Sequence, residues 1–144
     1  MKAILIAATV LSGSFSLNSF AALRLTNCGQ GDQKFREIHT GDGDFRIQQK
    51  HRWGCVTYNG QGLTMDMCGR SNQKFIELPV GDGTFRLKAK TLSNQCMEIQ
   101  GNRIIYQKCG RGNQKFSRYT CYQEDGMQWC RYKAKHTNLC IQNN

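Results

Sequence analysis

The sequence predicts an all-β domain, and three observations support this fold class. An eight-residue motif that begins Cys-Gly and ends Gln-Lys-Phe starts at Cys28, Cys68 and Cys109, so it returns after 40 and 41 residues. Residues 85–90 and 131–135 alternate apolar and basic side chains, which is the period of half-buried strands. Glycine beside asparagine or aspartate recurs between such stretches, as it does in hairpin turns. The 144 residues therefore predict one domain made of three similar β repeats of about 40 residues.

The first 22 residues have the pattern of a secretory signal peptide. Lys2 is followed by an apolar run over residues 3–11, and Ser19-Phe20-Ala21 forms a small-x-small cleavage site. The run is too short to span a bilayer, so no transmembrane segment is expected. An ordinary amphipathic N-terminal helix is the alternative. We therefore expect residues 1–22 to be removed on export and residues 23–144 to form a single secreted or periplasmic domain.

Turn residues recur at similar places and divide each repeat into about four short strands. An Asp-Gly turn leads into an aromatic residue in the segments 42–47 and 82–87, and more loosely in 125–132. Asn59-Gly60 and Gly101-Asn102 mark a second hairpin turn in two of the repeats. No stretch after residue 22 shows a helical period. Three such repeats that close on one another suggest a β-trefoil.

The 8 cysteines form an even set, which in an exported protein indicates a disulfide framework. Two pairs are each 13 residues apart and flank the hairpin turns at Asn59-Gly60 and Gly101-Asn102. The first and last cysteines would flank the same hairpin of the remaining repeat, with its tip open between the chain ends. Zinc binding is the alternative, but no Cys-x-x-Cys pair is present and no metal is expected. The predicted disulfides are Cys28–Cys140, Cys55–Cys68, Cys96–Cys109 and Cys121–Cys130.

The repeated Gln-Lys-Phe motif also carries a resemblance to a known family. With the Asn or Asp before it and the Cys a few residues earlier, it is similar to the Gln-x-Trp signature of ricin-B-type lectin domains; it occupies residues 33–35, 73–75 and 114–116. The resemblance covers essentially all of residues 23–144 and implies a disulfide-stapled, carbohydrate-binding β-trefoil. Small exported bacterial trefoils of this type also resemble the receptor-binding subunits of cytolethal distending toxins, which implies a toxin partner subunit.

The resemblance implies a sugar pocket built from three positions in each repeat. In ricin-like domains an Asp lies two residues after the first Cys of the hairpin, an aromatic residue lies two before the second Cys, and the Asn of the motif completes the pocket. The acid and the amide hold hydroxyl groups while the ring stacks on the apolar face of the sugar. This sequence departs from the pattern in every repeat, because the acid position holds Thr57, Glu98 and Gln142, the aromatic position Asp66, Gln107 and Thr26, and the amide position Asn72, Asn113 and Asp32.

The best-preserved pocket combines Glu98, Gln107, Asn113 and Gln114, with Tyr106 nearby but on the other face of its strand. The Gln of each motif has an alternative, structural role in tying neighbouring loops together. The Lys beside each Asn-Gln pair is expected to supplement a pocket that has lost its aromatic ring. The candidate carbohydrate-binding residues are Thr57, Asp66, Asn72, Gln73, Glu98, Tyr106, Gln107, Asn113, Gln114 and Lys115.

Six aromatic residues recur at related places in the repeats. Half of them close the Gln-Lys-Phe motifs, and the others follow the Asp-Gly turns. We expect these rings to meet near the threefold axis and to form the core. They are Phe35, Phe45, Phe75, Phe85, Phe116 and Trp129.

The net charge of +10, from 20 Lys and Arg against 10 Asp and Glu, predicts a basic surface. Lys34, Lys74 and Lys115 are threefold equivalents beside the candidate pockets. A solvated surface is one interpretation of this charge. Attraction to an anionic glycan or another polyanionic surface is the other.

A small basic secreted protein could also be a nuclease. A two-histidine phosphodiesterase needs an acid and a base that converge on one phosphate. His51 and His136 fall on matching positions of two repeats and would point apart, while His39 stands alone. No Ser-His-Asp, Cys-His or phosphate-cradling glycine pattern is present. We therefore expect no catalysis, no cofactor and no nucleic-acid partner.

The sequence thus predicts a secreted, lectin-like carbohydrate-binding protein, with the cell-surface-binding subunit of a bacterial toxin as one form of that function. The expected partner is a glycan, anionic in one interpretation, or a glycoconjugate on a cell surface. The alternative is a protein–protein interaction module, an inhibitor or an assembly partner. Its contact would be Thr120–Met127, a segment enclosed by Cys121 and Cys130 that lacks a counterpart in the other repeats.

Overall fold

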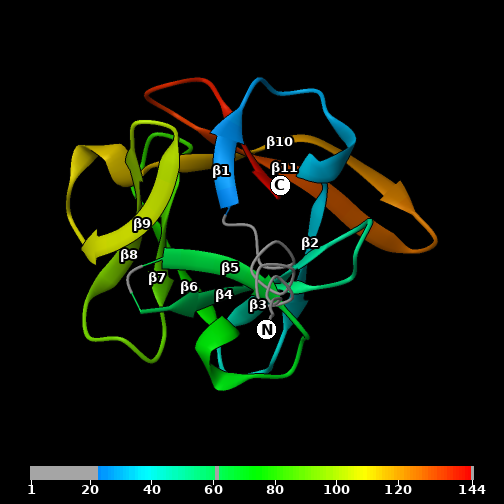
Figure 1. Ribbon diagram of the computed structural model, residues 1–144, viewed down its shortest axis with the longest axis horizontal. Coiled ribbons are helices and arrows are strands. Elements are labelled where there is room, and N and C mark those ends of the chain that lie inside the picture. Colours follow the sequence, from blue (N-terminus) through cyan, green and yellow to red (C-terminus); the bar gives the residue numbers. More distant parts are fainter. Residues whose placement is uncertain (1–22, 61, 144) are drawn as a thin grey trace, which may run out of the picture.

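The computed structural model describes residues 23–60 and 62–143, and strands dominate them (Figure 1). The all-β prediction is therefore confirmed. The predicted signal peptide, residues 1–22, lies outside the described residues and stays a prediction. The elements are β1 (Leu23–Thr26), η2 (Gly31–Gln33), β2 (Phe35–His39), β3 (Phe45–Gln49), β4 (Cys55–Asn59), β5 (Gly62–Asp66), η3 (Ser71–Gln73), β6 (Phe75–Pro79), β7 (Phe85–Ala89), β8 (Gln95–Gln100), β9 (Arg103–Lys108), η4 (Gly112–Gln114), β10 (Phe116–Glu124), β11 (Met127–Ala134) and β12 (Cys140–Asn143), where η marks a short 3-10 turn.

Three hairpins pair with one another in a closed ring and form a barrel. They are β2–β3, β6–β7 and β10–β11. β3 meets β6, β7 meets β10, and β11 meets β2, which closes the ring. Neighbouring hairpins join where Phe45 pairs with Phe75 and where Phe85 pairs with Phe116.

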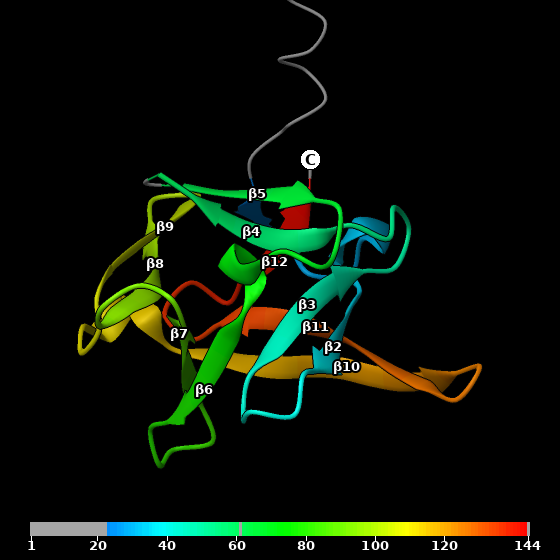
Figure 2. The same ribbon diagram turned by 90° about the horizontal axis from the view of Figure 1, so that it is seen from below.

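The remaining hairpins, β4–β5, β8–β9 and β12–β1, cover one end of this barrel as a cap. Figure 2 shows β4 and β5 lying across the ends of β3 and β6. Gly60 and Gly101 turn two of these hairpins with φ of 61° and 66°, a region that glycine adopts without steric penalty. The third hairpin is formed by the two ends of the described chain, so its tip is open. β5 and β1 both pair with β9, which links the cap hairpins to each other.

Disulfides close the cap hairpins and one barrel hairpin, in the four pairs predicted from the sequence. In two of the cap hairpins the bonded cysteines are 13 residues apart, which is the spacing from which the pairs were predicted. A framework of this kind fits an extracellular or periplasmic protein. The bonds are Cys28–Cys140, Cys55–Cys68, Cys96–Cys109 and Cys121–Cys130.

Alternate residues of the barrel strands fill its interior. In β7, Phe85, Leu87 and Ala89 are buried, whereas Arg86 and Lys88 between them are partly exposed. Burial of every second residue is what the period-two pattern predicts. The other four phenylalanines of the predicted core belong to the same hydrophobic cluster: Phe35, Phe45, Phe75 and Phe116.

Trp129, the sixth predicted core aromatic, lies elsewhere. Where β11 meets β2, the residue that pairs with Phe35 is Cys130, at the position that phenylalanine fills in the other two contacts. Successive strand residues point to opposite faces, so this difference of one residue turns Trp129 away from the barrel interior. It is buried against Trp53 instead. The prediction that Trp129 joins the axial aromatic cluster is therefore wrong.

Candidate functional site

The glutamine of each motif is fully buried and serves the fold. In Gln33, Gln73 and Gln114 the side-chain carbonyl accepts hydrogen bonds from the backbone N–H groups three and four residues earlier. The side-chain NH₂ donates to a backbone carbonyl six residues earlier, at 2.7 to 2.8 Å. Each amide thus ties its 3-10 turn to the strand before it, as the structural interpretation of the motif predicts. Such an amide has no free face to offer a sugar.

The best-preserved predicted pocket is partly filled by its own side chains. Glu98 is only 8% exposed, and its Oε1 lies 3.1 Å from Gln114 Nε2 and 3.7 Å from Arg111 Nε. Asn113 is exposed on the 3-10 turn beside them. Arg111 was missed by the sequence reasoning, although its position two residues after the motif cysteine is also basic at Arg70. The carboxylate that would hold a sugar hydroxyl is therefore engaged with a guanidinium.

The equivalent pocket next to β4 is engaged in the same way. Thr57 is buried; its hydroxyl donates to a backbone carbonyl of its own strand at 3.0 Å and accepts a 3.0 Å bond from Gln73 Nε2. Asp66 lies 3.4 Å from Arg70 Nε, and Asn72 Nδ2 donates to a backbone carbonyl of β4 at 3.1 Å. The structure brings the predicted residues together in space, but it uses their polar atoms to hold the hairpin and the 3-10 turn.

A cavity of about 500 Å³ opens on the outer side of the β8–β9 hairpin and contains two of the predicted residues, Tyr106 and Gln107. The ring of Tyr106 packs against Tyr58 at 6.1 Å, and its hydroxyl donates to the backbone carbonyl of Gly60. Burial and the neighbouring Tyr58 raise the pKa of the Tyr106 phenol. The other residues that line the cavity were not predicted as site residues from the sequence. They are Gly62, Gln95, Gln100, Arg103 and Ile105.

The lysines beside the motifs lie at the open ends of the three barrel hairpins, where the two strands of a hairpin begin and end. Each motif lysine shares a backbone hydrogen bond of 2.9 to 3.0 Å with a second lysine at the end of the same hairpin. Two lysines are therefore neighbours at each open end. The pairs are Lys34 and Lys50, Lys74 and Lys90, and Lys115 and Lys135.

Acidic residues of a neighbouring turn face these lysines. Lys115 Nζ lies 3.8 Å from Asp82 Oδ2, and Lys135 Nζ lies 2.5 Å from the same oxygen. Lys90 pairs with Asp44, whose side chain is fully buried. The hydrogen bond from Lys90 lowers the pKa of Asp44 against the opposing effect of burial, and the hydrogen bond from Lys135 lowers the pKa of Asp82. Part of the net charge is thus neutralised at these open ends, and a role for Lys115 beside Asn113 stays a prediction.

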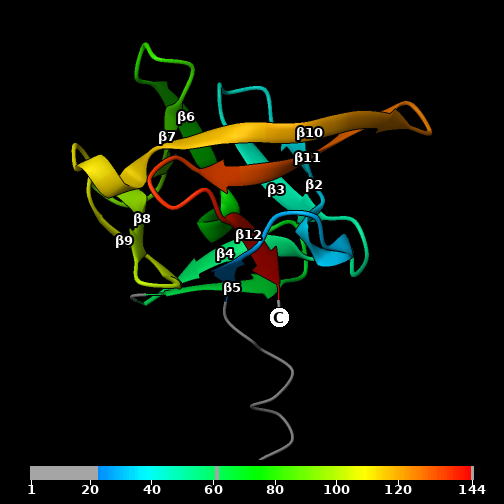
Figure 3. The same cartoon turned by 90° about the horizontal axis from the view of Figure 1, so that it is seen from above.

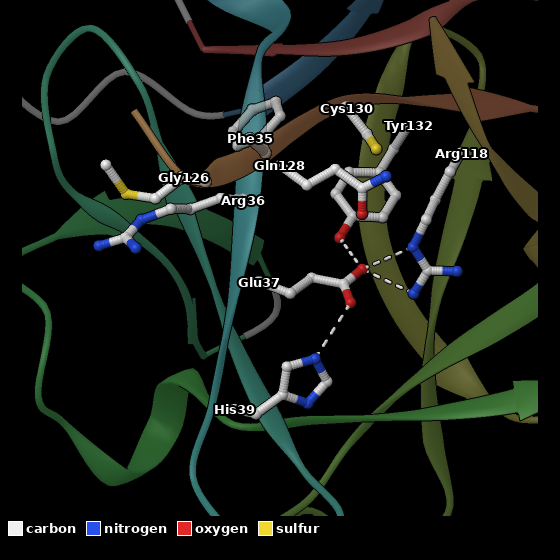
Figure 4. Close-up of a pocket in the computed structure, with 10 residues that line it drawn as sticks. Phe35, Arg36, Glu37, His39, Arg118, Gly126, Gln128, Cys130 and Tyr132 are labelled. Atoms are coloured by element: carbon white, nitrogen blue, oxygen red, sulfur yellow. Dashed lines mark hydrogen bonds and ion pairs between the residues drawn. The ribbon is translucent and has the colours of Figure 1, made fainter. Parts of the chain in front are cut away.

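A cluster of charged residues joins the barrel strands β2, β6 and β10, and Figure 4 shows Glu37, His39, Arg118 and Tyr132 around it. Glu37, Glu77 and Arg118 each follow the motif phenylalanine by two residues, so they occupy equivalent places on three barrel strands. Arg118 bridges the two acids: its Nε lies 2.9 Å from Glu37 Oε2 and its Nη2 lies 2.5 Å from Glu77 Oε1. The Tyr132 hydroxyl donates to Glu37 Oε2 at 2.5 Å, and His39 Nε2 lies 3.7 Å from the other oxygen.

Burial and the charge of Glu37 shift the pKa of Arg118 in opposite directions and the pKa of Tyr132 in the same direction. Burial by itself would lower the pKa of Arg118, but the hydrogen bond to Glu77 and the charge of Glu37 raise it above its usual range. Burial, together with Glu37, raises the pKa of Tyr132 well above its ordinary value. A cavity of about 300 Å³ beside the cluster is lined by side chains of β2 and β11. Ion pairs and hydrogen bonds thus hold the cluster together, since Glu37 Oε2 already accepts from Arg118 and Tyr132.

No group of three His, Cys, Asp or Glu side chains is placed to hold a metal ion within residues 23–60 and 62–143. His51 and His136 lie near different 3-10 turns, with their Nε2 atoms facing Gly31 and Gly112 respectively. In the described part of the chain, no helix has the length and apolar character needed to cross a membrane.

Comparison with solved structures bears on the fold. A designed 3-fold symmetric protein, ThreeFoil, matches with a TM-score of 0.57 and 20% identity, over 64% of this chain and 75% of that one. The fold is β-trefoil-like. Cytolethal distending toxin structures from Haemophilus ducreyi and Actinobacillus actinomycetemcomitans align with TM-scores of 0.49 and 0.44 and identities of 16% and 13%. They cover 86% and 88% of this chain, and 88% and 90% of theirs. No family model and no curated protein matches the chain.

Proposed function

We propose that this chain is a secreted β-trefoil of three repeats that binds carbohydrate and does not catalyse a reaction. The observation that carries the proposal is the cavity on the β8–β9 hairpin, because amide, guanidinium and phenol groups line it together. Sugar sites typically combine a few convergent polar groups with an aromatic ring. Export after removal of residues 1–22 is part of the proposal, and the disulfides support it.

Each lining group has a distinct part in this site. Gln95 and Gln107 present amides, which both donate to and accept from sugar hydroxyl groups. Arg103 is exposed at the edge of the cavity and would meet a carboxylate or sulfate. Arg24 pairs with Arg103 in register across β1 and β9, which brings a second positive charge to this edge. The site therefore favours an anionic glycan over a neutral one.

A glycan array run at low and at high salt tests the proposal. We expect Gln107→Ala to weaken binding about fivefold, the effect of one lost hydrogen bond of about 1 kcal/mol. We expect Arg103→Ala to remove most of the salt dependence. Gln123→Ala, at an exposed amide of the β10–β11 hairpin, is the control. The proposal fails when no glycan binds, or when Gln107→Ala binds as well as the control.

A second candidate function is protein binding, because the β10–β11 hairpin extends well past the barrel (Figures 2 and 3). Residues 123–126 at its tip are exposed, and Cys121–Cys130 cross-links the hairpin behind them. A projecting, cross-linked hairpin of this kind suits insertion into a partner. The partner classes are a protein that this chain inhibits and a companion subunit of a toxin.

This second function predicts a stoichiometric complex that depends on the hairpin tip. Asp125 has a φ of 54°, which asparagine also tolerates, so Glu124→Gln with Asp125→Asn removes both charges and keeps the turn. Loss of co-elution with a purified candidate subunit, with glycan binding unchanged, would favour this function. Unchanged co-elution would assign the contact to another surface.

A further inference from the structure

A corner residue with left-handed backbone precedes the first strand of each cap hairpin, β4, β8 and β12, and one of these corners holds tryptophan. Each corner residue lies two positions before the cysteine of its strand. The φ angles are 59° at Trp53, 53° at Asn94 and 59° at Asn138. Asparagine adopts this conformation readily, whereas a bulky side chain does so rarely. Trp53 therefore has a backbone conformation that is unfavourable for tryptophan, whereas the two matching corners hold asparagine, which adopts it readily. An unfavourable residue kept at such a place points to a function of its side chain.

The backbone of Trp53 is held on both sides. Its N–H donates to the carbonyl of Gln49 at 3.1 Å, and its own carbonyl accepts a 3.1 Å bond from Gln48 Nε2. Both glutamines are buried. Trp53 nevertheless remains 53% exposed, and within the described residues the other exposed large hydrophobic residues are Met67 and Tyr119. A rigid corner thus presents one large ring to solvent.

Trp129 forms the floor under this ring. The two indole centroids are 5.9 Å apart and the ring planes meet at 79°, so the contact is edge to face. Trp129 is fully buried and pairs with Tyr122 across the β10–β11 hairpin. The Cys121–Cys130 disulfide cross-links this hairpin immediately beside both residues. We call Trp53, Trp129 and Tyr122 the aromatic platform.

Three cations surround the aromatic platform. The amino groups of Lys34 and Lys50 lie 4.9 and 5.2 Å from the centre of the Tyr122 ring, and the Arg36 guanidinium lies 5.8 Å from the centre of the Trp129 ring. Among the described residues, Glu124 is the one acid in ion-pair contact with them, through Lys50 at 2.6 Å. The cations around Tyr122 and Trp129 therefore keep a positive surplus, and Trp129 is the ring against which the exposed Trp53 packs.

We propose that the aromatic platform binds an acidic glycan. The exposed face of Trp53 stacks on a pyranose ring, and Lys34 and Arg36 contact a sulfate or carboxylate on the same sugar chain. One indole with a cationic rim matches the size of a single sugar ring, whereas a stable protein interface covers roughly 800 Å² on each partner. This site shares no residue with the β8–β9 cavity, so it stands independently of the function proposed above.

Intrinsic fluorescence reports on this site directly, because the chain has 2 tryptophans and both belong to the platform. Wild-type protein is titrated with a heparin-derived hexasaccharide, with sialyllactose and with neutral lactose, and affinities are confirmed by calorimetry. We expect a fluorescence change with the sulfated or the sialylated probe and little with lactose. The two acidic probes separate sulfate from carboxylate recognition.

Trp53→Asn is the decisive variant, because asparagine occupies the two matching corners and the fold should accept it. We expect its affinity for the acidic probe to fall about tenfold, the effect of one lost stacking ring, with an unfolding temperature equal to or above that of the wild type. Tyr119→Asn, which removes another exposed ring, is the matched control. Lys34→Ala should weaken binding without changing stability.

The outcomes separate this site from the β8–β9 cavity. The inference is overturned when Trp53→Asn binds the acidic probes like the wild type, or when lactose binds equally well. It is also overturned when Trp53→Asn loses only the binding of a purified protein partner. Gln107→Ala should leave the fluorescence response intact; if it abolishes all glycan binding while Trp53→Asn does not, the cavity binds sugar and the platform does not.

Discussion

Arg118→Met should destabilise the barrel by about 2 kcal/mol, because it leaves Glu37 and Glu77 facing each other without a counter-charge. Breaking a buried ion pair costs about 3–5 kcal/mol, and an exposed pair contributes below about 1 kcal/mol. The side chains of Arg118 and Glu77 are 29% and 34% exposed, and that of Glu37 is 16% exposed. The expected value therefore lies between the two limits and corresponds to a fall of about 7 °C in the unfolding temperature.

Urea unfolding with the disulfides intact measures this loss. Lys88→Met is the control, because it removes a partly exposed cation from the barrel strand β7. A double-mutant cycle with Glu77→Gln should give a coupling energy of about 1 kcal/mol, because the two side chains are in direct contact. A loss below about 0.5 kcal/mol in Arg118→Met would refute the reasoning, since that is the size expected of an ordinary surface substitution.

Three further predictions concern the buried ties of the fold. Gln114→Ala should cost about 2 kcal/mol, measured by calorimetry, because it leaves two backbone N–H groups without a partner and removes the hydrogen bond that Gln114 donates to Glu98; an unchanged unfolding temperature would contradict this. Lys90→Met should destabilise the protein at neutral pH. The paired Asp44 has a lowered pKa, so its stabilisation is present above its ordinary value near 3.8 and is lost as the pH falls below it. The gap between wild type and variant in urea unfolding should therefore close in acid, and a gap independent of pH would refute the assignment. Replacing Cys121 and Cys130 by serine should lower stability by about 2–3 kcal/mol and speed proteolysis of the hairpin tip, with the barrel retained.

The hairpins and disulfides could be predicted from the sequence because both follow from the repeat register. Cysteines 13 residues apart around a glycine turn predicted a bond across that turn, and the matching hairpin with an open tip predicted Cys28–Cys140; the structure has these bonds. The structural role of the buried motif glutamines could also be predicted, because an amide in a recurring tight turn has few hydrogen-bond partners besides the turn itself.

The contacts between the barrel hairpins could not be predicted in the same way. Glu37, Glu77 and Arg118 occupy equivalent positions, but only the closure of the barrel shows that these positions meet at its axis. Arg111 reaches Glu98 through a side-chain conformation that spacing does not reveal. Trp129 differs from its expected place by one residue, and in a strand one residue reverses the face.

The Cys28–Cys140 bond joins residues 112 apart and lies beside the pairing of β1 with β12. A force applied to the two ends of the domain would pass through this bond and would bypass the barrel and the cap hairpins β4–β5 and β8–β9. In a single-molecule pulling experiment, the oxidised protein should therefore extend very little. Full extension should appear only after reduction, so the redox state of one bond decides whether the domain bears mechanical load.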